Sequence, residues 1–327
     1  MRVVFFGTPR FALPSLQALI DQPEMEVAGV LSQPDRPSGR GRKLQPTPVK
    51  ALAQQHGIPL WQPERLRRDP EVLSQLESLG ADVFVVVAYG QLLPPRVLEM
   101  PGLGCVNVHG SLLPAYRGAA PIQWAVARGE VETGITTMLM DQGMDTGGML
   151  LKTKVAISPT QTAEDLAGIL APLGADLLIK TLFLLEAGDL RPEPQVEAEA
   201  SYAPLLSKID FALDWHKPAR DLHNQIRAFY PQCFTTLRGE RLKVLQSQPP
   251  ELTASLSASA TSANTDQRPA TPGTLTAIMK QTGMVVQTGQ GSLLLTEVQA
   301  AGRRAQSTWD FANGIRLEVG EILSPHP

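Results

Sequence analysis

Three polar residues follow or end two apolar runs of the sequence and could act together in catalysis. Two of them lie at the end of one run, and the third lies after the other run. Asn107 and His109 are two positions apart, so in a strand an amide and an imidazole point to the same face. Gly134–Met140 is a second apolar run, and the glycine-rich loop after it contains Asp145. Because open α/β sheets bind ligands at the carboxyl ends of their strands, we predict that these three side chains converge there.

An amide, an imidazole and a carboxylate suit the direct transfer of an acyl-level group to an amine. The Asn107 amide can donate a hydrogen bond to a carbonyl oxygen as that oxygen becomes an oxyanion. His109 can stabilise the same charge as imidazolium or pass a proton to the leaving nitrogen. Asp145 can orient the imidazole or accept the proton that the attacking amine loses. The sequence leaves open which group finally takes that proton.

Other chemistries find less support. Ser111 follows His109-Gly110, but the G-x-S-x-G pattern of a serine nucleophile is absent. His109 and Asp145 are too few for a metal site, and no P-loop or G-x-G-x-x-G pattern supports an NTPase or a nicotinamide enzyme. Each residue alone also has a structural explanation, since a single histidine usually lies at the surface and an aspartate before Thr-Gly-Gly usually belongs to a turn.

The composition is that of an ordinary globular protein with two domains. The chain has 327 residues, of which 43% are apolar and 19% charged, and its net charge is −3. We find no apolar run of about eighteen residues, which argues against a membrane partner. Cys105 and Cys233 lie far apart and match no metal-ligand spacing. We therefore expect a reducing, cytoplasmic location, with no disulfide and no metal.

The order of the elements predicts an α/β fold for the first domain, residues 1–188. Short apolar runs alternate with helical patterns, as in a Rossmann-like, doubly wound and mainly parallel sheet. The apolar runs lie at 2–6, 27–31, 82–88 and 104–108.

A linker is predicted at 189–206 and a second domain at 207–327. Short strands separated by turns are typical of a small, OB-fold-like β-barrel. The predicted strands are 234–237, 242–246, 273–279, 284–288 and 293–299. The segment 249–272 is rich in Ser, Thr, Ala and Pro, and we predict that it is a disordered insert without an assigned function.

The residues between the predicted site strands carry a family resemblance. The stretch SLLPAYRGAAPIQWA, residues 111–125, closely resembles the signature loop of the formyltetrahydrofolate-dependent formyltransferases. FFGTPRFALPSL, QPDRPSGRGRKLQPTPVKALA, DQGMDTGGML, YAPLLSKID and IRAFYP resemble the branch of that family that acts on methionyl-tRNA. The similarity covers nearly the whole chain except the insert. Departures are minor, with Gly148 where an acid is common and an atypical Gln232-Cys233.

The resemblance implies a catalytic trio and a folate cosubstrate. The family's Asn, His and Asp correspond to Asn107, His109 and Asp145, and the formyl donor is 10-formyltetrahydrofolate, without a metal. The acceptor is the α-amino group of methionine on initiator tRNA. The loop Ser111, Leu112, Leu113 and Pro114 is implied at the folate. Further candidates for the pterin pocket are Val86, Ala88, Tyr89 and Gly90.

Two groups of basic residues suggest where tRNA binds. We expect the chain to be a monomer. Four lie in a Gly/Pro-rich loop with one acid, and the resemblance implies that this loop contacts the acceptor arm: Arg36, Arg40, Arg42 and Lys43. Two lie in the predicted barrel, Arg238 and Arg241. Three alternatives stay open: a formyltransferase for a sugar amine or nucleotide, a hydrolase that releases formate, and a non-catalytic RNA-binding protein.

Overall fold

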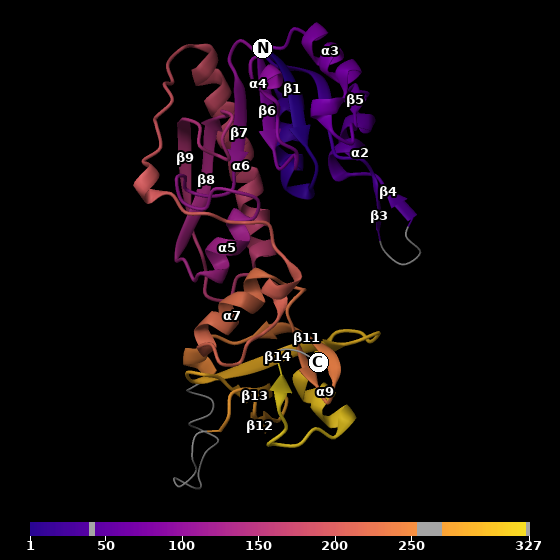
Figure 1. The fold of residues 1–327 in the computed structure, drawn as a ribbon, viewed down its shortest axis with the longest axis vertical. Coiled ribbons are helices and arrows are strands. Elements are labelled where there is room, and N and C mark those ends of the chain that lie inside the picture. The colour runs from indigo at the N-terminus through magenta and orange to yellow at the C-terminus, as the bar shows by residue number, and fades with distance from the viewer. Residues whose placement is uncertain (39–42, 254–269, 325–327) are drawn as a thin grey trace. The chain divides into compact units, whose positions relative to one another are not determined.

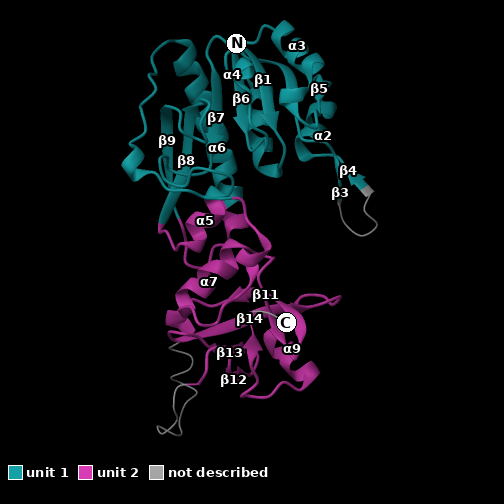
Figure 2. Ribbon diagram, viewed as in Figure 1, with its two compact units in different colours: residues 1–121, 132–156, 167–204 teal, residues 122–131, 157–166, 205–327 magenta. Residues whose placement is uncertain are grey.

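The structure, a computed structural model, describes residues 1–38, 43–253 and 270–324. The chain divides into two compact units (Figure 2). Unit 1 contains residues 1–121, 132–156 and 167–204, and unit 2 contains residues 122–131, 157–166 and 205–327. These units differ from the boundaries predicted above. Residues 189–204 belong to unit 1 although the sequence suggested a linker, and two short segments before residue 188 pack with unit 2.

Unit 1 is built on a seven-stranded sheet with the order β5-β2-β1-β6-β7-β8-β9 (Figure 1). The first five strands are parallel, and β8 and β9 are antiparallel. The strands are β1 (Arg2–Gly7), β2 (Glu26–Leu31), β5 (Leu60–Trp61), β6 (Val83–Val87), β7 (Cys105–His109), β8 (Glu132–Leu139) and β9 (Met149–Ala156). The chain moves outward from β1 to β2 and β5 and then returns to β6, so the strand order reverses between β1 and β6. Such a switch point opens a ligand crevice at the carboxyl ends of the strands.

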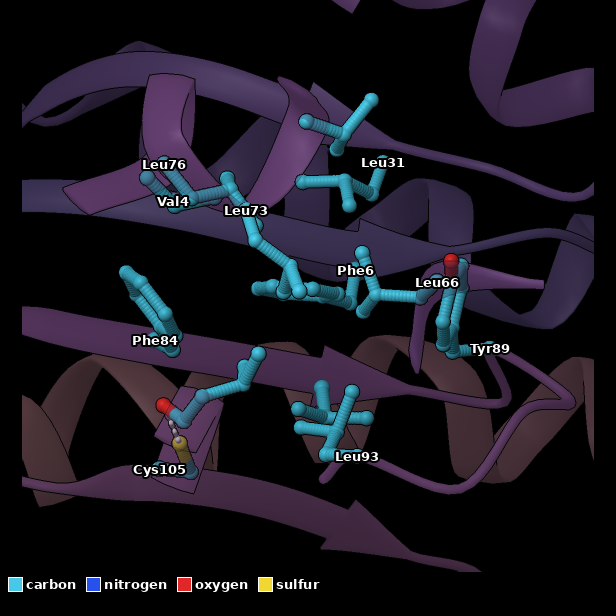
Figure 3. Close-up of a cluster of buried hydrophobic side chains, with 13 residues drawn as sticks. Val4, Phe6, Leu31, Leu66, Leu73, Leu76, Phe84, Tyr89, Leu93 and Cys105 are labelled. Carbon is cyan, nitrogen blue, oxygen red and sulfur yellow. Dashed lines mark hydrogen bonds between the residues drawn. The ribbon is translucent and has the colours of Figure 1, made fainter. Parts of the chain in front are cut away.

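Helices cover both faces of this sheet, which confirms the doubly wound prediction. On one face, Val4 and Phe6 of β1 and Phe84 of β6 form a buried cluster with Leu73 and Leu76 of α3 (Pro70–Ser78) (Figure 3). The β6 segment, VFVVV, is buried at every position, as expected for a parallel strand covered on both sides. The remaining helices that contribute residues to unit 1 are α1 (Leu13–Asp21), α2 (Pro48–Gln55), α4 (Pro95–Leu98), α5 (Pro121–Ala127) and α6 (Ala163–Glu186).

Helix α6 packs on the opposite face of the sheet. Thr181 Oγ1 lies 2.8 Å from Thr137 Oγ1 of β8, and Leu178 and Leu182 are fully buried. Its 24 residues form a helix long and apolar enough to cross a membrane, although no such run was expected from the sequence. The described residues contain one helix of this length and apolarity. Core helices of globular proteins can have the same length and composition.

A hairpin of β3 (Arg36–Ser38) and β4 (Lys43–Gln45) leaves the edge of unit 1 (Figure 1). Its base is held by Asp35, which accepts hydrogen bonds from Lys50 Nζ at 2.6 Å and Gln62 Nε2 at 2.8 Å. These hydrogen bonds, of which that from Gln62 has the larger effect, lower the pKa of Asp35 below its ordinary value. The hairpin therefore starts from a charged and hydrogen-bonded anchor.

Unit 2 contains an antiparallel sheet with the order β12-β13-β14-β11-β10-β16. Leu323 N donates to Gly273 O and Leu275 N to Glu321 O, so the segment around β16 also bonds to the start of β12. These contacts join the two ends of the sheet and confirm the predicted small barrel. Its elements are α7 (Ala219–Ala228), β10 (Phe234–Leu237), β11 (Glu240–Ser247), β12 (Leu275–Met279), β13 (Gly283–Gln287), β14 (Ser292–Ala300), β15 (Gln306–Ser307), α9 (Thr308–Ile315) and β16 (Leu323–Ser324).

The sequence anticipated five of these strands but neither β15 nor β16. Both are only two residues long, which is too short for an alternating pattern to be recognised. Most of the segment predicted as an insert, residues 254–269 of 249–272, lies outside the described residues.

Unit 2 is expected to lose stability on mild acidification because of His223 in α7. Its Nδ1 lies 2.9 Å from Ser247 Oγ and its Nε2 lies 2.8 Å from Pro159 O. Burial, reinforced by the positive charges of Arg227 and Arg220, lowers the pKa of His223 below its ordinary value of 6.5. The unfolded chain thus binds more protons than the folded chain just below pH 6.5, and the free energy of unfolding falls there as pH decreases.

Thermal unfolding of the parent and of His223→Gln at roughly pH 7.5 and 5.5 checks this. The parent's unfolding temperature should drop more between the two pH values than that of the variant. Equal drops would show that His223 does not link protonation to the stability of unit 2.

Candidate active site

Strand β7 brings Asn107 and His109 to one face at the carboxyl edge of the sheet. Asn107 pairs with Val86 of β6 on one side and with Met138 of β8 on the other. Its Oδ1 is buried and has no hydrogen-bond partner among the described residues. A half-turn of the amide exchanges Oδ1 and Nδ2, so this position can present either an acceptor or a donor to a ligand. A buried polar atom without a partner is uncommon and suits a ligand-binding position.

The ring of His109 is oriented by a main-chain oxygen. His109 is 5% exposed, and its Nε2 lies 2.9 Å from the carbonyl oxygen of Tyr116. A carbonyl oxygen only accepts, so Nε2 carries the hydrogen and Nδ1 is the basic atom of the neutral ring. Nδ1 lies 3.7 Å from Asp145 Oδ2, close enough for an ion pair when the ring is protonated. The structure therefore brings two members of the predicted trio together, with Nδ1 as the ring nitrogen that faces the carboxylate.

Asp145 is held in an unusual conformation in the loop between β8 and β9. Its φ of +54° lies in the left-handed region, which costs energy for a residue other than glycine. The main-chain N–H of Gly118 donates to Asp145 Oδ2 at 2.8 Å. Asp141 stabilises the same loop, since its Oδ1 accepts from Gly143 N at 2.9 Å and Thr146 Oγ1 at 2.7 Å.

The signature loop is tied to β8 and to its own turn. Thr136 Oγ1 donates to Ser111 O at 2.7 Å and accepts from Leu113 N at 3.0 Å. Ser111 Oγ donates to Ala115 O at 2.6 Å, so its hydroxyl already has a main-chain acceptor. These bonds position the Tyr116 carbonyl that orients His109. Sequence reasoning missed both Thr136 and Tyr116, because neither lies in a pattern typical of catalysis.

Residues 192–203, which we call the strap, run across both loops of the site. Glu193 exchanges two main-chain hydrogen bonds of 2.8 Å with Met149. Gln195 Nε2 donates to the carbonyl oxygens of Asp145 at 2.7 Å and Gly147 at 2.8 Å. Glu197 forms a 2.8 Å ion pair with Arg117, whose side chain is buried. The sequence suggested only a linker here, and no periodicity marks the strap.

The strap also borders a pocket. A cavity of about 440 Å³ lies beside the loop of Asp145, lined in part by Met140, Asp141, Gly147, Pro192 and Gln195. Within the described ranges, no group of three or more His, Cys, Asp or Glu side chains gathers as a metal site would require.

The candidate pterin residues after β6 lie at the switch point. Tyr89 O accepts hydrogen bonds from Thr8 Oγ1 at 2.9 Å and Gln33 Nε2 at 3.3 Å, which joins the ends of β6, β1 and β2. Tyr89 is 2% exposed, and its ring meets that of Phe6 edge-on at 5.4 Å (Figure 3). Burial raises the pKa of Tyr89, and its hydroxyl has no partner within the described chain.

The other three candidates in this region differ from one another. Ala88 and Gly90 are exposed and have positive φ values of 48° and 84°. Val86 instead belongs to the buried cluster on the α3 side of the sheet. Ala88 and Gly90 are thus exposed at the carboxyl end of β6, whereas the Val86 side chain lies in the core.

The predicted tRNA-binding residues fall into three groups. Arg36 is exposed in β3, and Lys43 begins β4. Arg40 and Arg42 lie outside the described residues. In unit 2, the Arg241 guanidinium lies 3.7 Å from the centre of the Phe234 ring and is exposed.

Arg238 is already engaged within unit 2. It bonds to both carboxylate oxygens of Glu321 at 2.7 and 2.5 Å, and it donates to the Ile315 carbonyl at 3.1 Å and the Arg316 carbonyl at 3.3 Å. These contacts leave Arg238 a weaker candidate for nucleic acid than Arg241.

Comparison with known proteins agrees with this arrangement. Residues 1–182 match the model of the formyl transferase family, and residues 205–316 match that of its C-terminal domain. The chain is similar to proteins named methionyl-tRNA formyltransferase. It is 59% identical to one from Synechococcus sp. (strain JA-3-3Ab), over all of both chains. It is 55% identical to one from Thermosynechococcus vestitus, over 98% of this chain and 97% of the relative.

Solved structures with the same fold include sugar-modifying enzymes. A sugar 3N-formyl transferase crystallised with dTDP and 5-N-formyl-THF superposes with a TM-score of 0.62 at 16% identity, covering 93% of this chain and 99% of its own. An N-formyltransferase from Helicobacter canadensis, in complex with folinic acid and dTDP-3-aminofucose, gives 0.62 at 18% identity, over 91% and 98% of the two chains. The two matched regions and the full-length similarity to these relatives show that the chain is an enzyme of the formyl transferase family.

Proposed function

We propose that this enzyme transfers the formyl group of 10-formyltetrahydrofolate to the α-amino group of methionine esterified to initiator tRNA. The observation that carries the reaction is the 3.7 Å pair of His109 and Asp145, with Asn107 two residues before His109 on β7. The acceptor is supported by full-length similarity to proteins named methionyl-tRNA formyltransferase. We expect the enzyme to act as a monomer in the cytoplasm, without a metal.

Asn107 and His109 act on the charge that develops during transfer. When the amine attacks the formyl carbon, the carbonyl oxygen becomes an oxyanion, and the Asn107 amide, turned to present Nδ2, donates to it. His109 keeps its Nε2 hydrogen on the Tyr116 carbonyl, so only Nδ1 gains or loses a proton. As imidazolium it adds a positive charge beside the oxyanion.

Asp145 balances the protons. The attacking amine loses one proton and the folate nitrogen that leaves gains one, so no net proton is consumed. Asp145, 3.7 Å from His109 Nδ1, takes the proton from the amine or stabilises the imidazolium that delivers it to the leaving nitrogen. An α-amino group with a pKa of about 7.7–8.0 has a neutral fraction that can attack without further activation.

The folate lies on the same edge in this proposal. Ser111–Pro114 begin two residues after His109, and Ala88, Tyr89 and Gly90 follow β6, the neighbouring strand. Tyr89 belongs to the same buried cluster as Val86, and its main-chain oxygen joins the ends of the neighbouring strands. Val86 contributes through the packing that holds β6 in place rather than as a direct contact.

Formyl transfer measured with three acceptors tests the function. Formyltetrahydrofolate with a labelled formyl group is supplied with methionyl initiator tRNA, with a small primary amine, or with water alone. Label should appear on the tRNA and not on the small amine or as formate. Folate turnover with no formylated tRNA would overturn the tRNA acceptor, and label on an amino sugar offered in a fourth reaction would identify the acceptor used instead.

Loss of positive charge from the β3–β4 hairpin is expected to impair use of tRNA more than use of folate. Arg36 is exposed in β3, and Arg42 is assigned to the same loop from the sequence alone. A side chain that neutralises a phosphate releases counterions, so its removal weakens binding and lowers the salt slope by about one. Arg36→Ala and Arg42→Ala should raise the KM for methionyl-tRNA and leave the KM for the folate unchanged.

Arg68→Ala is the matched control for this prediction, since Arg68 is exposed in unit 1 but lies outside the hairpin. It should leave the salt dependence at the parent's value. Equal loss towards tRNA and folate in the hairpin variants would contradict a tRNA contact.

A further inference from the structure

The strap contains one side chain that reaches the main chain of the proposed catalytic loop. Gln195 Nε2 lies 2.7 Å from Asp145 O and 2.8 Å from Gly147 O, and its Oε1 lies 3.0 Å from Arg117 Nε. Two carbonyl oxygens on one side and a guanidinium N–H on the other are compatible with one amide orientation only. The amide of Gln195 is therefore fully engaged, with two donors and one acceptor in use.

These bonds complete a closed ring around Asp145. Its carboxylate accepts from Gly118 N at 2.8 Å, and Gly118 follows Arg117 in the chain. The Arg117 side chain donates to Gln195, and Gln195 donates back to the Asp145 carbonyl. Asp145 is thus fixed at its side chain and at its main chain by two loops that are bonded to each other.

The ring matters because Asp145 lies in a sparsely populated backbone conformation. A φ of +54° is disfavoured for a residue with a Cβ, and it persists where surrounding contacts determine it. Gly147 is equally constrained, since a Cβ there would lie 1.8 Å from Leu139 O. Both residues that Gln195 bonds are therefore held in a turn with little freedom, and the direction of the Asp145 carboxylate depends on that turn.

We propose that Gln195 is a positioning residue for formyl transfer, which acts by holding Asp145 at the orientation in which its carboxylate faces His109 Nδ1. This inference rests on the proposed function, since it requires Asp145 to take part in the reaction. Loss of the Gln195 amide should leave the substrates bound and slow the chemical step, because a small misplacement of a reacting group is enough to reduce catalysis.

Two variants remove the donor in different ways. Gln195→Met keeps the length of the side chain but makes no hydrogen bond to the two carbonyl oxygens. Gln195→Glu keeps an acceptor for Arg117 and cannot donate to Asp145 or Gly147. Glu197→Gln is the control, because it alters the ion pair of Arg117 elsewhere in the strap and leaves the Gln195 amide intact.

Rates of formyl transfer to methionyl-tRNA, measured alone and in the Asp145→Asn background, test the proposal. Both Gln195 variants should lower kcat by about tenfold or more, with both KM values within about twofold of the parent. Glu197→Gln should stay within about twofold of the parent in kcat. In Asp145→Asn, the Gln195 substitution should add less than about twofold further loss, because residues that act as a unit are not additive.

Four outcomes would overturn the inference. Parental kcat in both Gln195 variants would show that the bonds do not matter for the reaction. A full tenfold loss on top of Asp145→Asn would show that Gln195 acts independently of Asp145. Unchanged transfer by Asp145→Asn alone would instead remove Asp145 from the proposed mechanism, and the inference would fall with it. Finally, Gln195→Met could lose kcat together with a lowered unfolding temperature, while Gln195→Glu remains stable and keeps the parental kcat. That result would indicate a structural role only.

Discussion

Replacing His109 by alanine is expected to reduce formyl transfer by about 10²–10⁴-fold, the range of a lost general acid or base. The imidazole is buried, its Nε2 is bonded to the Tyr116 carbonyl, and its Nδ1 faces Asp145 at 3.7 Å. Alanine removes both the proton-exchanging atom and the positive charge beside the oxyanion. Single-turnover transfer from formyltetrahydrofolate to methionyl-tRNA measures the loss without interference from product release.

Binding separates an enzyme from a non-catalytic RNA-binding protein in the same experiment. His109→Ala should bind methionyl-tRNA as tightly as the parent, since the imidazole acts only on the reacting atoms and offers little surface to the rest of the tRNA. His216→Ala is a suitable control: His216 also forms a histidine–aspartate pair, at 3.0 Å from Asp214, but it is exposed in unit 2. Undiminished formylation by His109→Ala would refute the mechanism.

Replacing Asn107 by aspartate is expected to lower kcat by about 10²–10³-fold, the usual effect of losing one oxyanion-hole donor. The two side chains have nearly the same shape, so packing between β6 and β8 should survive. The carboxylate cannot donate, however, and its negative charge would oppose the developing oxyanion. Steady-state kinetics with both substrates varied measures the effect.

The split between kcat and KM decides what Asn107 does. A fall in kcat at unchanged KM means that its bond forms in the transition state, whereas a raised KM at unchanged kcat would show ground-state binding only and contradict the oxyanion role. Asn313→Asp, at an exposed position of α9, controls for the added negative charge.

Local sequence was enough to identify the apolar strands and the two polar residues that share one of them, but not the short strands β3, β4, β15 and β16. The β6 segment is apolar throughout and mostly β-branched, so its composition predicts burial on both faces. Asn107 and His109 are two apart in a strand, and the period of a strand places them on one face whatever surrounds them. The fold class and the edge that carries the site follow from such short-range patterns, together with the reversal of strand order at β1 and β6.

Partners distant in sequence were decided by the tertiary structure alone. Gln195 is 50 residues from Asp145, and Arg238 is 83 residues from Glu321. These polar residues lie in segments without periodicity, so nothing local distinguishes a residue that holds a catalytic loop from one in solvent. The same holds for the tautomer of His109, which depends on the carbonyl of Tyr116 and on the loop that places it. The sequence by itself determined which chemical groups the site contains, because residue types and the period of a strand are local properties. Only the folded chain decided how these groups are oriented, because their orientation depends on hydrogen bonds between segments that are remote in sequence.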